Sequence, residues 1–469
     1  MIFDNLKDLR NKKYFAIIIG SGPAGISTAL KLEEKGIESL ILEAGSEDFT
    51  SSSLEFLNGE VSGDKYNDLK ISRLRQFGGS SGHWGGTCSL LKESDFDGWP
   101  IKKFDLNDYQ KDAKKILNIK KNFYFSKFSK KLDSFNMQWS NVRFKEKYFE
   151  YIKSSKKIHL SLNTNFHYFE GSDGNVSGLI CEKNGLHKKQ SKFYILSCGG
   201  IENSRSLLIT KIKNPNLFRY NLPIGKFYMD HPKHDIGEGI LVYDKLHKYL
   251  NRMNINQFPI TECENIQFSL NKDQVMNKDI LNSAVNLKLQ RVTANSSIIK
   301  QASCVAPKFI QKIYNSLNKQ NVYKFNLNIL QEQFPYENNS IELSSKLDPN
   351  GLPLPKINWK RSEKLKKSAE FIINEISDVF IEQNIGRISI IENMLETKDY
   401  HMTLGFHQMG GTRMGKDRDN SVVDKNLLVF GFKNLYINGS SIFRTGGYAH
   451  PTFTIVQLAS RLGDHLSKI

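Results

Sequence analysis

The stretch that decides the fold is YFAIIIGSGPAGISTALKLEEKGIESLILEAG, residues 14–45. Its apolar run, glycine-rich turn and amphipathic continuation predict a strand, a tight turn, a helix and a second strand ending at Glu43. This order is typical of a dinucleotide-binding βαβ unit. The unit alone does not separate FAD from NAD, because both cofactors present a diphosphate to the turn.

The three glycines of this turn have different predicted roles. Gly20 permits the sharp turn, Gly22 lets backbone N–H groups approach a pyrophosphate, and Gly25 lets the helix pack on the strand. Glu43 would accept hydrogen bonds from the ribose hydroxyls. The predicted cofactor-binding residues of this unit are Gly20, Gly22, Pro23, Ala24, Gly25, Glu43 and Ala44. The alternative is a glycine turn that binds no ligand.

Length and composition limit the classes of protein. A chain of 469 residues predicts two domains, which we expect to be interleaved because no Pro/Gly/Ser-rich linker separates them. No apolar run reaches the roughly 20 residues of a membrane-spanning helix, and no secretory signal is visible, so the expectation is a cytoplasmic protein. The five cysteines are scattered and contain no CxxC pair, which predicts reduced thiols and neither a disulfide framework nor a metal site.

The formal net charge is +17. The basic residues are dispersed, without an aromatic-interleaved basic stripe or a helix-turn-helix pattern, so nucleic-acid binding is not expected. A basic surface can also steer small anions, which leaves open a phosphorylated or nucleotide-linked substrate.

Two further glycine clusters are candidates for contact with a ligand. SRLRQFGGSSGHWGGTCSLL, residues 72–91, predicts a ligand-lining loop that contains Gly78, Gly79, Ser80, His83, Trp84 and Gly85. KFYILSCGGIENSRSLLITK, residues 192–211, predicts a strand, a turn at Gly199 and Gly200, and a helix. A turn needed only for packing is the alternative for this second cluster.

The rest of the chain predicts mixed α and β structure. Alternating residues at about 158–198 predict an antiparallel meander. Residues 239–397 predict strands in KFNLNILQEQF and SIELSS, a turn at DPNGLP, and a helix in SEKLKKSAEFIINEISDVFIEQ. The final stretch predicts a strand, a glycine-rich turn and a long helix that begins near Pro451 or Thr452.

Several motifs occur in a fixed order along the chain: GSGPAG near the N-terminus, GGSSGHWGG in the middle, and HQMGGTRMG, NLYINGSSIF and HPTFTIVQLASRL near the C-terminus. With these motifs, the chain resembles the glucose-methanol-choline (GMC) oxidoreductases. FYILSCGGIENSRSLL, PIGKFYMDHP and LSSKLDPNGLP extend the match. The resemblance is somewhat greater to the sugar and polyol dehydrogenases and the pyranose-oxidase-like members. Only residues from about 240 to 325 contain no motif of the family.

The resemblance implies an α/β fold in which a Rossmann-like FAD-binding domain is interleaved with an α+β substrate domain. The implied FAD-binding domain comprises residues 1–110, 155–238 and 398–469, and the substrate-binding domain comprises residues 111–154 and 239–397. It also implies oxidation of a CH–OH group of an alcohol, sugar or polyol by hydride transfer to N5 of the flavin.

Such a reaction needs a base within reach of the hydroxyl, and imidazole titrates nearest physiological pH. We expect His407 to be that base and His450 to hold the substrate oxygen or share the proton, which is the His/His form of the family's pair. No third ligand lies at metal-binding spacing, so no metal is expected. The remaining predicted cofactor contacts near the C-terminus are Asn438, Gly439, His450, Pro451 and Thr452.

Two positions raise separate hypotheses. His83 stands in a GG-x-S-x-H pattern, whose histidine in some oxidases of the family is bonded to the flavin, so we hypothesise covalent FAD at His83. The alternative is a histidine that packs on the flavin without a bond. Asn438 replaces the Asp that relatives often carry, and its amide can still donate and accept hydrogen bonds.

Two other functions stay open at this point: a flavoprotein of this fold with non-oxidative, lyase-like chemistry, and an inactive nucleotide-binding protein. The expected electron acceptor is oxygen, a quinone or a redox protein. The sequence does not specify the substrate, the choice between oxidase and dehydrogenase, or the oligomeric state.

Overall fold

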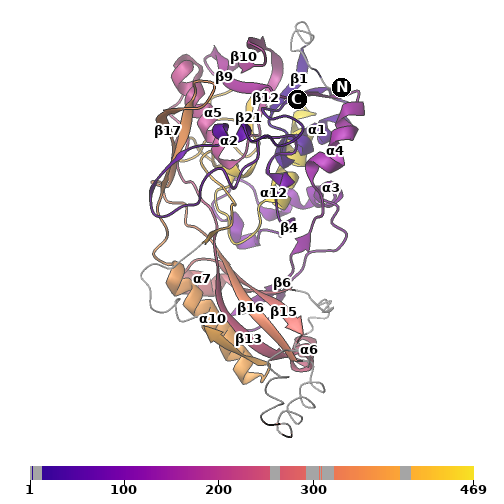
Figure 1. Cartoon of the computed structure of the whole chain (residues 1–469), viewed down its shortest axis with the longest axis vertical. Coiled ribbons are helices and arrows are strands. Elements are labelled where there is room, and N and C mark those ends of the chain that lie inside the picture. Colours follow the sequence, from indigo (N-terminus) through magenta and orange to yellow (C-terminus); the bar gives the residue numbers. More distant parts are fainter. Residues whose placement is uncertain are drawn as a thin grey trace.

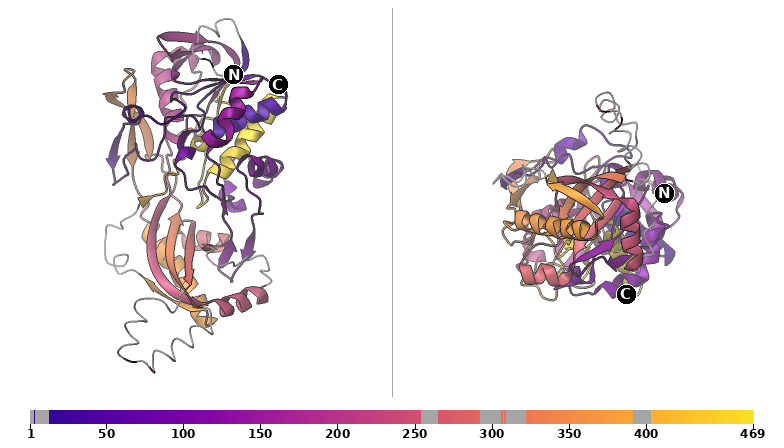
Figure 2. Two further views of the ribbon diagram at one scale, coloured as in Figure 1. Left: turned by 45° about the vertical axis from the view of Figure 1, so that its right-hand side comes forward. Right: turned by 90° about the horizontal axis from the view of Figure 1, so that it is seen from below.

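The computed structural model describes residues 13–253, 265–291, 322–390 and 403–469, together with residues 3, 306 and 308. The chain forms two stacked parts along the long axis of the molecule (Figure 1). One part is built on a parallel sheet with helices, and the other on a large antiparallel sheet. Figure 2 shows the same division from two further directions.

The parallel sheet has the strand order β21-β12-β1-β2-β8, and each neighbouring pair is parallel. Its strands are β1 (Tyr14–Ile19), β2 (Ser39–Leu42), β8 (Ile158–Ser161), β12 (Ser191–Leu196) and β21 (Leu435–Ile437). The three strands β2, β8 and β21 are buried throughout. Continuous apolar strands of this kind are typical of parallel sheets, because both faces are covered.

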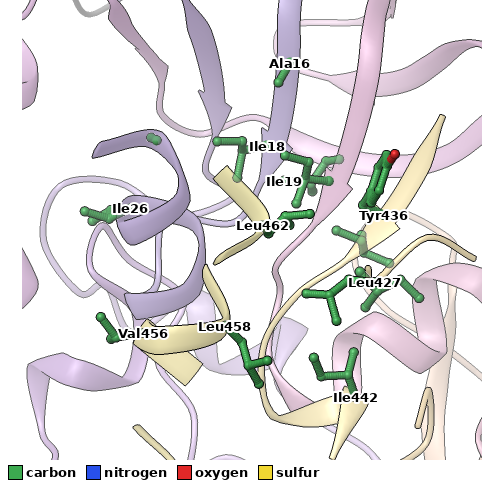
Figure 3. Packing of buried hydrophobic residues seen from close by; sticks show 14 of the residues in the cluster. Ala16, Ile18, Ile19, Ile26, Leu427, Tyr436, Ile442, Val456, Leu458 and Leu462 are labelled. Carbon is green, nitrogen blue, oxygen red and sulfur yellow. The ribbon is translucent and has the colours of Figure 1, made fainter. Parts of the chain in front are cut away.

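Three helices accompany this sheet: α1 (Pro23–Glu34), α5 (Gly200–Lys213) and α12 (Thr452–Leu466). Helices α1 and α12 pack on each other although they lie at opposite ends of the chain. Figure 3 shows Ile26 of α1 and Val456, Leu458 and Leu462 of α12 in the core near β1. The predicted start of the last helix near Pro451 or Thr452 is confirmed.

The predicted meander at 158–198 is only partly correct. Three strands form an antiparallel sheet in the order β11-β10-β9, from β9 (Asn165–Ser172), β10 (Asn175–Glu182) and β11 (Leu186–Lys189). The flanking strands β8 and β12 belong instead to the parallel sheet. Their short runs permitted either pairing, and burial on both faces decides the outcome.

The second part is an eight-stranded sheet with the order β19-β13-β16-β15-β14-β6-β5, in which β20 also pairs with β13. Its strands are β5 (Phe125–Lys127), β6 (Leu132–Phe135), β13 (Pro232–Val242), β14 (Asn265–Leu270), β15 (Ser283–Arg291), β16 (Val322–Gln331), β19 (Gly386–Ile390) and β20 (Thr403–Leu404). Helix α10 (Leu365–Glu382) packs on this sheet through its apolar face, which confirms the helix predicted there (Figure 1). The short helices of this part are α6 (Tyr243–Arg252) and α7 (Lys272–Lys278).

A small sheet of β17 (Ser340–Leu347), β18 (Pro353–Trp359) and β3 (Glu60–Gly63) lies beside α5. The turn predicted at DPNGLP joins β17 to β18, where the Asp348 amide donates to the Leu352 carbonyl. The remaining elements are α2 (Ser53–Phe56), α3 (Gln110–Ile116), α4 (Phe144–Ser154), β4 (Thr87–Cys88), β7 (Gln138–Trp139) and the 3₁₀ segments η2 (Gly79–Gly82), η3 (Glu93–Phe96), η4 (Lys103–Tyr109), η5 (Pro215–Leu217) and η6 (Ser440–Ile442).

The predicted fold class is confirmed, because a Rossmann-type parallel sheet is combined with a second, largely antiparallel part. Strand β13 belongs to the large antiparallel sheet and begins at Pro232. The division of the chain at residues 110, 154, 238 and 397 stays a prediction.

Candidate active site

The glycines of the first turn differ in what surrounds them. Gly20 has φ +102°, and a Cβ there would lie 2.6 Å from the Ser197 carbonyl oxygen. A Cβ on Gly25 would lie 2.0 Å from the Gly20 carbonyl oxygen, so α1 rests directly on the turn. Gly22 has extended backbone and no atom within 4 Å of its Cβ position. Packing therefore requires glycine at Gly20 and Gly25, whereas Gly22 faces open space.

A cavity of about 900 Å³ extends from this turn to the start of α12. Its walls include most of the predicted site residues, namely Gly20, Gly22, Pro23, Ala24, Glu43, Ala44, Gly79, Ser80, His83, Trp84, Gly85, Gly199, Gly200, His407, Gly439, His450, Pro451 and Thr452. Segments from all three glycine clusters and from the C-terminal motifs therefore meet around one space.

Three predicted residues, Gly25, Gly78 and Asn438, lie outside the cavity lining. Gly25 is packed on Gly20, and the Gly78 amide donates to Ser21 Oγ at 3.2 Å. Asn438 is fully buried, and its side-chain amide donates to Thr28 Oγ1 at 3.0 Å. These three residues support the wall of the cavity, and their direct contact with a cofactor stays a prediction.

The cavity suits a dinucleotide. Its volume lies in the range of about 300–1,000 Å³ that is usual for ligand pockets. No side chain caps the N-terminus of α1 or of α5, so their first N–H groups remain available to an anion. Gly22, Gly85 and Gly199 have no atom within 4 Å of their Cβ positions, which leaves room for close approach to the backbone.

Glu43 lines the cavity at the end of β2, and both of its carboxylate oxygens are held by the turn. Oε2 accepts from Ser21 N at 3.0 Å and from Ser21 Oγ at 2.6 Å, and Oε1 accepts from Gly45 N at 2.8 Å. Burial raises the pKa of Glu43, against the opposing effect of these hydrogen bonds. The carboxylate is therefore fixed in orientation beside the cavity, where it retains lone pairs for a ribose hydroxyl.

At the other end of the cavity, His407 and His450 line the wall and meet edge to face, with ring centroids 4.7 Å apart and an interplanar angle of 69°. A third histidine, His231, contacts His407, with the two Nδ1 atoms 2.8 Å apart. Sequence reasoning identified His407 and His450 but not His231, whose only signal was its position in the family-like segment PIGKFYMDHP.

Asp230 orients two of these histidines through the backbone. Its Oδ1 accepts from the amide of His407 at 2.7 Å and from the amide of His231 at 2.8 Å. Its Oδ2 accepts from the Tyr66 hydroxyl at 2.8 Å, and Tyr66 lies 2.6 Å from the Tyr228 hydroxyl. One buried carboxyl thus ties the two histidine-bearing segments together.

Burial keeps all three imidazoles neutral. It lowers the pKa of His231 to about 4 and that of His450 to about 3, and the pKa of His407 falls well below its usual range. Burial also raises the pKa of Asp230 to about 7. At neutral pH, the histidines are therefore able to accept protons.

An ion cluster that the sequence did not reveal lines the wall near α5. Glu202 accepts from Arg73 at 2.5 Å and from Arg205 at 3.0 Å, and Arg205 also reaches Asp348 at 2.6 Å. Burial alone would raise the pKa of Glu202, but the charges of Arg205 and Arg73 lower it overall. The Glu202 carboxylate is therefore ionised, and both Glu202 and Asp348 are paired with arginines.

The described part of the chain has no membrane-spanning helix and no metal-binding cluster. None of its helices has the length and apolar character needed to cross a membrane. No group of His, Cys, Asp and Glu residues in these segments has an arrangement suited to a metal ion. Cys88, Cys181 and Cys198 are free thiols, and Cys263 and Cys304 lie outside the described residues.

With this geometry established, comparison with known proteins defines the class. The sequence pattern described as FAD binding domain matches residues 13–55, and the pattern described as GMC oxidoreductase matches residues 335–459. The solved structure of pyridoxine 4-oxidase from Mesorbium loti has the same fold, with a TM-score of 0.59 at 12% identity over 97% of this chain and 99% of that one. The chain thus has the fold of an FAD-binding protein.

Among characterised relatives, 2-methyl-1,2-propanediol dehydrogenase of Mycolicibacterium austroafricanum is 32% identical over 141 residues, or 29% of this chain and 24% of the relative. The fructose dehydrogenase large subunit of Gluconobacter japonicus is 23% identical over 59% of this chain and 47% of the relative. Pyranose 2-oxidase of Lyophyllum shimeji is 45% identical over 51 residues, which are 11% of this chain and 8% of that enzyme. The aligned segments span less than half the length of each relative.

The chain carries an FAD-binding domain and the C-terminal domain of the GMC oxidoreductases. The resemblance drawn from the motifs is therefore confirmed.

Proposed function

We propose that this protein is an FAD-dependent oxidoreductase that oxidises a CH–OH group of an alcohol, polyol or sugar. The observation that carries the proposal is the position of the histidine cluster at one end of a cavity whose other end is the dinucleotide turn. The similar proteins include enzymes named for a diol, a sugar and a pyranose.

The residues that would hold FAD are the glycines of the cavity wall, the two uncapped helix N-termini and Glu43. When bound, FAD supplies the acceptor for the hydride of the alcohol carbon. The protein must then orient the CH–OH group, remove its hydroxyl proton and exclude water from the site.

In this proposal His407 takes the hydroxyl proton. Nε2 of the neighbouring His231 is buried and has no hydrogen-bond partner in the described part of the chain. The backbone of Gly446 and Gly447 raises the pKa of His231, against the larger effect of burial, and so favours a proton on Nε2. With that proton on Nε2, Nδ1 of His231 accepts from Nδ1 of His407. Nε2 of His407 is then left without a proton and is the basic nitrogen.

His450 is the proposed partner that holds the substrate oxygen. Its backbone amide donates to Ser89 Oγ at 2.8 Å, which fixes the loop that leads into α12. Its Nδ1 is buried and has no partner in the described part of the chain. A neutral imidazole with a free ring nitrogen can hydrogen bond to an alcohol or a carbonyl product.

The test is anaerobic mixing of the flavin-loaded protein with a panel of alcohols, polyols and sugars while the visible flavin absorbance is followed. Bleaching by one compound class would support the oxidation and identify the substrate class. Readmitting oxygen or adding a quinone would then distinguish an oxidase from a dehydrogenase. Bound flavin that no member of a broad panel bleaches would favour non-oxidative chemistry, and a protein that cannot bind FAD would overturn the proposal.

A further inference from the structure

A lysine lies in the cavity wall beside the histidines. Lys233 is the second residue of β13 and follows His231 by two positions. Lys233 lines the same cavity as His407 and His450.

The backbone of Lys233 is held firmly in the sheet. It pairs with Leu330 of β16 and with Thr403 of β20. Thr403 Oγ1 also donates to the Lys233 carbonyl oxygen at 2.8 Å. The root of the side chain is therefore fixed at the cavity edge, while the side chain itself is exposed.

The ammonium group of Lys233 has no ion-pair partner among the residues that the structure describes. This contrasts with Lys92 and Lys131, which pair with Asp133 and Glu375. The positive charge of Lys233 contributes to lowering the pKa of both His407 and His450, after burial and the neighbouring imidazoles. Its charge is thus directed at the site and not neutralised by the described chain.

The carboxylates in the cavity wall are already occupied elsewhere. Glu202 and Asp348 pair with arginines, and Glu43 is held by Ser21 and Gly45. None of these groups lies in the segments 231–233 and 403–408, which carry Lys233 and His407. The histidine end of the described cavity wall therefore carries an uncompensated positive charge.

The same end of the cavity has apolar surface. Phe406, directly before His407, is 43% exposed, and Ile71 is 58% exposed, although both side chains are large and hydrophobic. Both residues line the cavity. A 2.7 Å hydrogen bond from Gln408 Nε2 to Ser72 Oγ holds their two segments together. A ligand that covered these groups would remove apolar area from water.

We propose that Lys233 determines specificity by binding an anionic group on the substrate, so that the alcohol oxidised carries a carboxylate or a phosphate together with an apolar portion. This inference rests on the proposed function and narrows its substrate class. An ammonium group can bind either anion as a compact charge, and the net charge of +17 would steer such substrates toward the protein.

The first experiment compares related alcohols with and without an anionic group. Benzyl alcohol, 4-(hydroxymethyl)benzoate and 4-(hydroxymethyl)phenyl phosphate, and in parallel glycerol, glycerate and glycerol 3-phosphate, are mixed anaerobically with the flavin-loaded protein. We expect an anionic member to reduce the flavin at least about 10-fold faster per unit concentration than the neutral one. The carboxylate and phosphate arms show which anion is preferred.

Variants then test the residue. Lys233→Gln should remove most of the ratio between the anionic and the neutral rate, and added salt should lower that ratio in the unmodified protein. Lys248→Gln is the matched control, because Lys248 is an exposed lysine of α6 that does not line the cavity. An advantage of the anionic alcohols that survives Lys233→Gln would overturn the inference.

Binding without turnover separates this inference from the proposed oxidation. Benzoate and phenyl phosphate cannot be oxidised here, and their binding is followed by the change in the flavin spectrum. Lys233→Gln should raise the dissociation constant of at least one of them about 5- to 30-fold. If no alcohol bleaches the flavin but this Lys233-dependent binding is present, the oxidation fails and the anion site stands. If neither anion binds more tightly to the unmodified protein than to Lys233→Gln, the anion site is wrong.

Discussion

The three imidazoles illustrate how single residues acquire a chemical role from burial. The Nδ1 atoms of His231 and His407 lie 2.8 Å apart, and Asp230 fixes both backbones. Burial favours the neutral form of each ring. In the proposed role of His407 as the base, a ring that is already neutral and oriented needs no reorganisation when the substrate binds.

At this residue scale, replacing the proposed base has a clear expected effect. His407→Ala should lower the rate of anaerobic flavin reduction about 10²- to 10⁴-fold, because a positioned base is lost. Flavin content per protein should not change, and this is measured from the visible spectrum after gel filtration. His247→Ala is the control, because His247 is an exposed histidine of α6 that does not line the cavity. An unchanged reduction rate in His407→Ala would refute the assignment.

His83 carries the second residue-scale prediction. It lines the cavity, and burial lowers its pKa, so the ring is neutral and nucleophilic at neutral pH. If His83 bonds the flavin, acid precipitation should leave the yellow colour with the protein pellet. His83→Ala should release the colour to the supernatant. Full release from the unmodified protein would show that the flavin is bound non-covalently.

At the scale of elements, the first βαβ unit separates a packing glycine from a ligand-facing glycine. Gly25→Ala puts a Cβ 2.0 Å from the Gly20 carbonyl oxygen, so α1 must move from β1 and the protein should be strongly destabilised. Gly22→Ala meets no atom within 4 Å, and its extended backbone tolerates alanine. Its apoprotein should therefore unfold within about 0.5 kcal/mol of the unmodified one.

The distinguishing measurement for this pair is flavin affinity. The Cβ of Gly22→Ala projects into the space from which a pyrophosphate would approach the N-terminus of α1, so we expect FAD to bind at least about 10-fold more weakly. Fluorescence titration of the apoprotein with FAD measures this. Normal FAD affinity in Gly22→Ala would mean that the diphosphate lies elsewhere.

Local sequence patterns predict elements better than they predict how strands pair. The strand, helix and turn of residues 14–45 follow from periodicity and glycine spacing, and so does the start of α12 at Thr452. By contrast, the sequences of β8 and β12 resemble meander strands, yet both join the parallel sheet. Pairing between strands distant in sequence depends on which apolar faces the whole chain covers, and a local pattern does not encode that.

At the scale of the whole molecule, the buried carboxyl of Asp95 and the partly buried carboxyl of Glu332 lie where the two parts meet. Asp95 accepts from Asn282 Nδ2 at 2.9 Å, and Glu332, directly after β16, accepts from the amide of Gly447 at 3.3 Å. Burial raises the pKa of Asp95 to about 6. Burial, with the Asp95 charge adding to it, raises the pKa of Glu332 to about 8.

These shifts predict how stability depends on pH. A carboxyl whose pKa is higher in the folded state contributes stability below its unfolded pKa, and this contribution is lost as pH rises through the folded value. For Glu332 the loss should extend from about pH 4.5 to about pH 8. Glu332→Gln keeps the shape of the side chain without its charge. Its free energy of unfolding, relative to that of the unmodified protein, should therefore increase by on the order of 1–2 kcal/mol from pH 6 to pH 9.

Urea unfolding of the apoproteins at these two pH values measures the effect. Glu363→Gln is the control, because its carboxylate is exposed and 3.7 Å from Lys360. The same stability difference at both pH values would contradict a buried, titrating Glu332.

The sequence by itself determined the dinucleotide turn and the α/β class, because glycine spacing and hydrophobic periodicity are local properties of the chain. Its ordered motifs carry the resemblance to GMC oxidoreductases, and that resemblance led to His407 and His450 as candidates. Only the tertiary structure brought Asp230 and His231 against His407 and placed Lys233 in the same cavity wall as His407, and it also formed the ion cluster of Arg73, Glu202 and Arg205. These contacts join residues up to 177 positions apart. They depend on how the sheets pack against each other, which short-range sequence patterns do not specify.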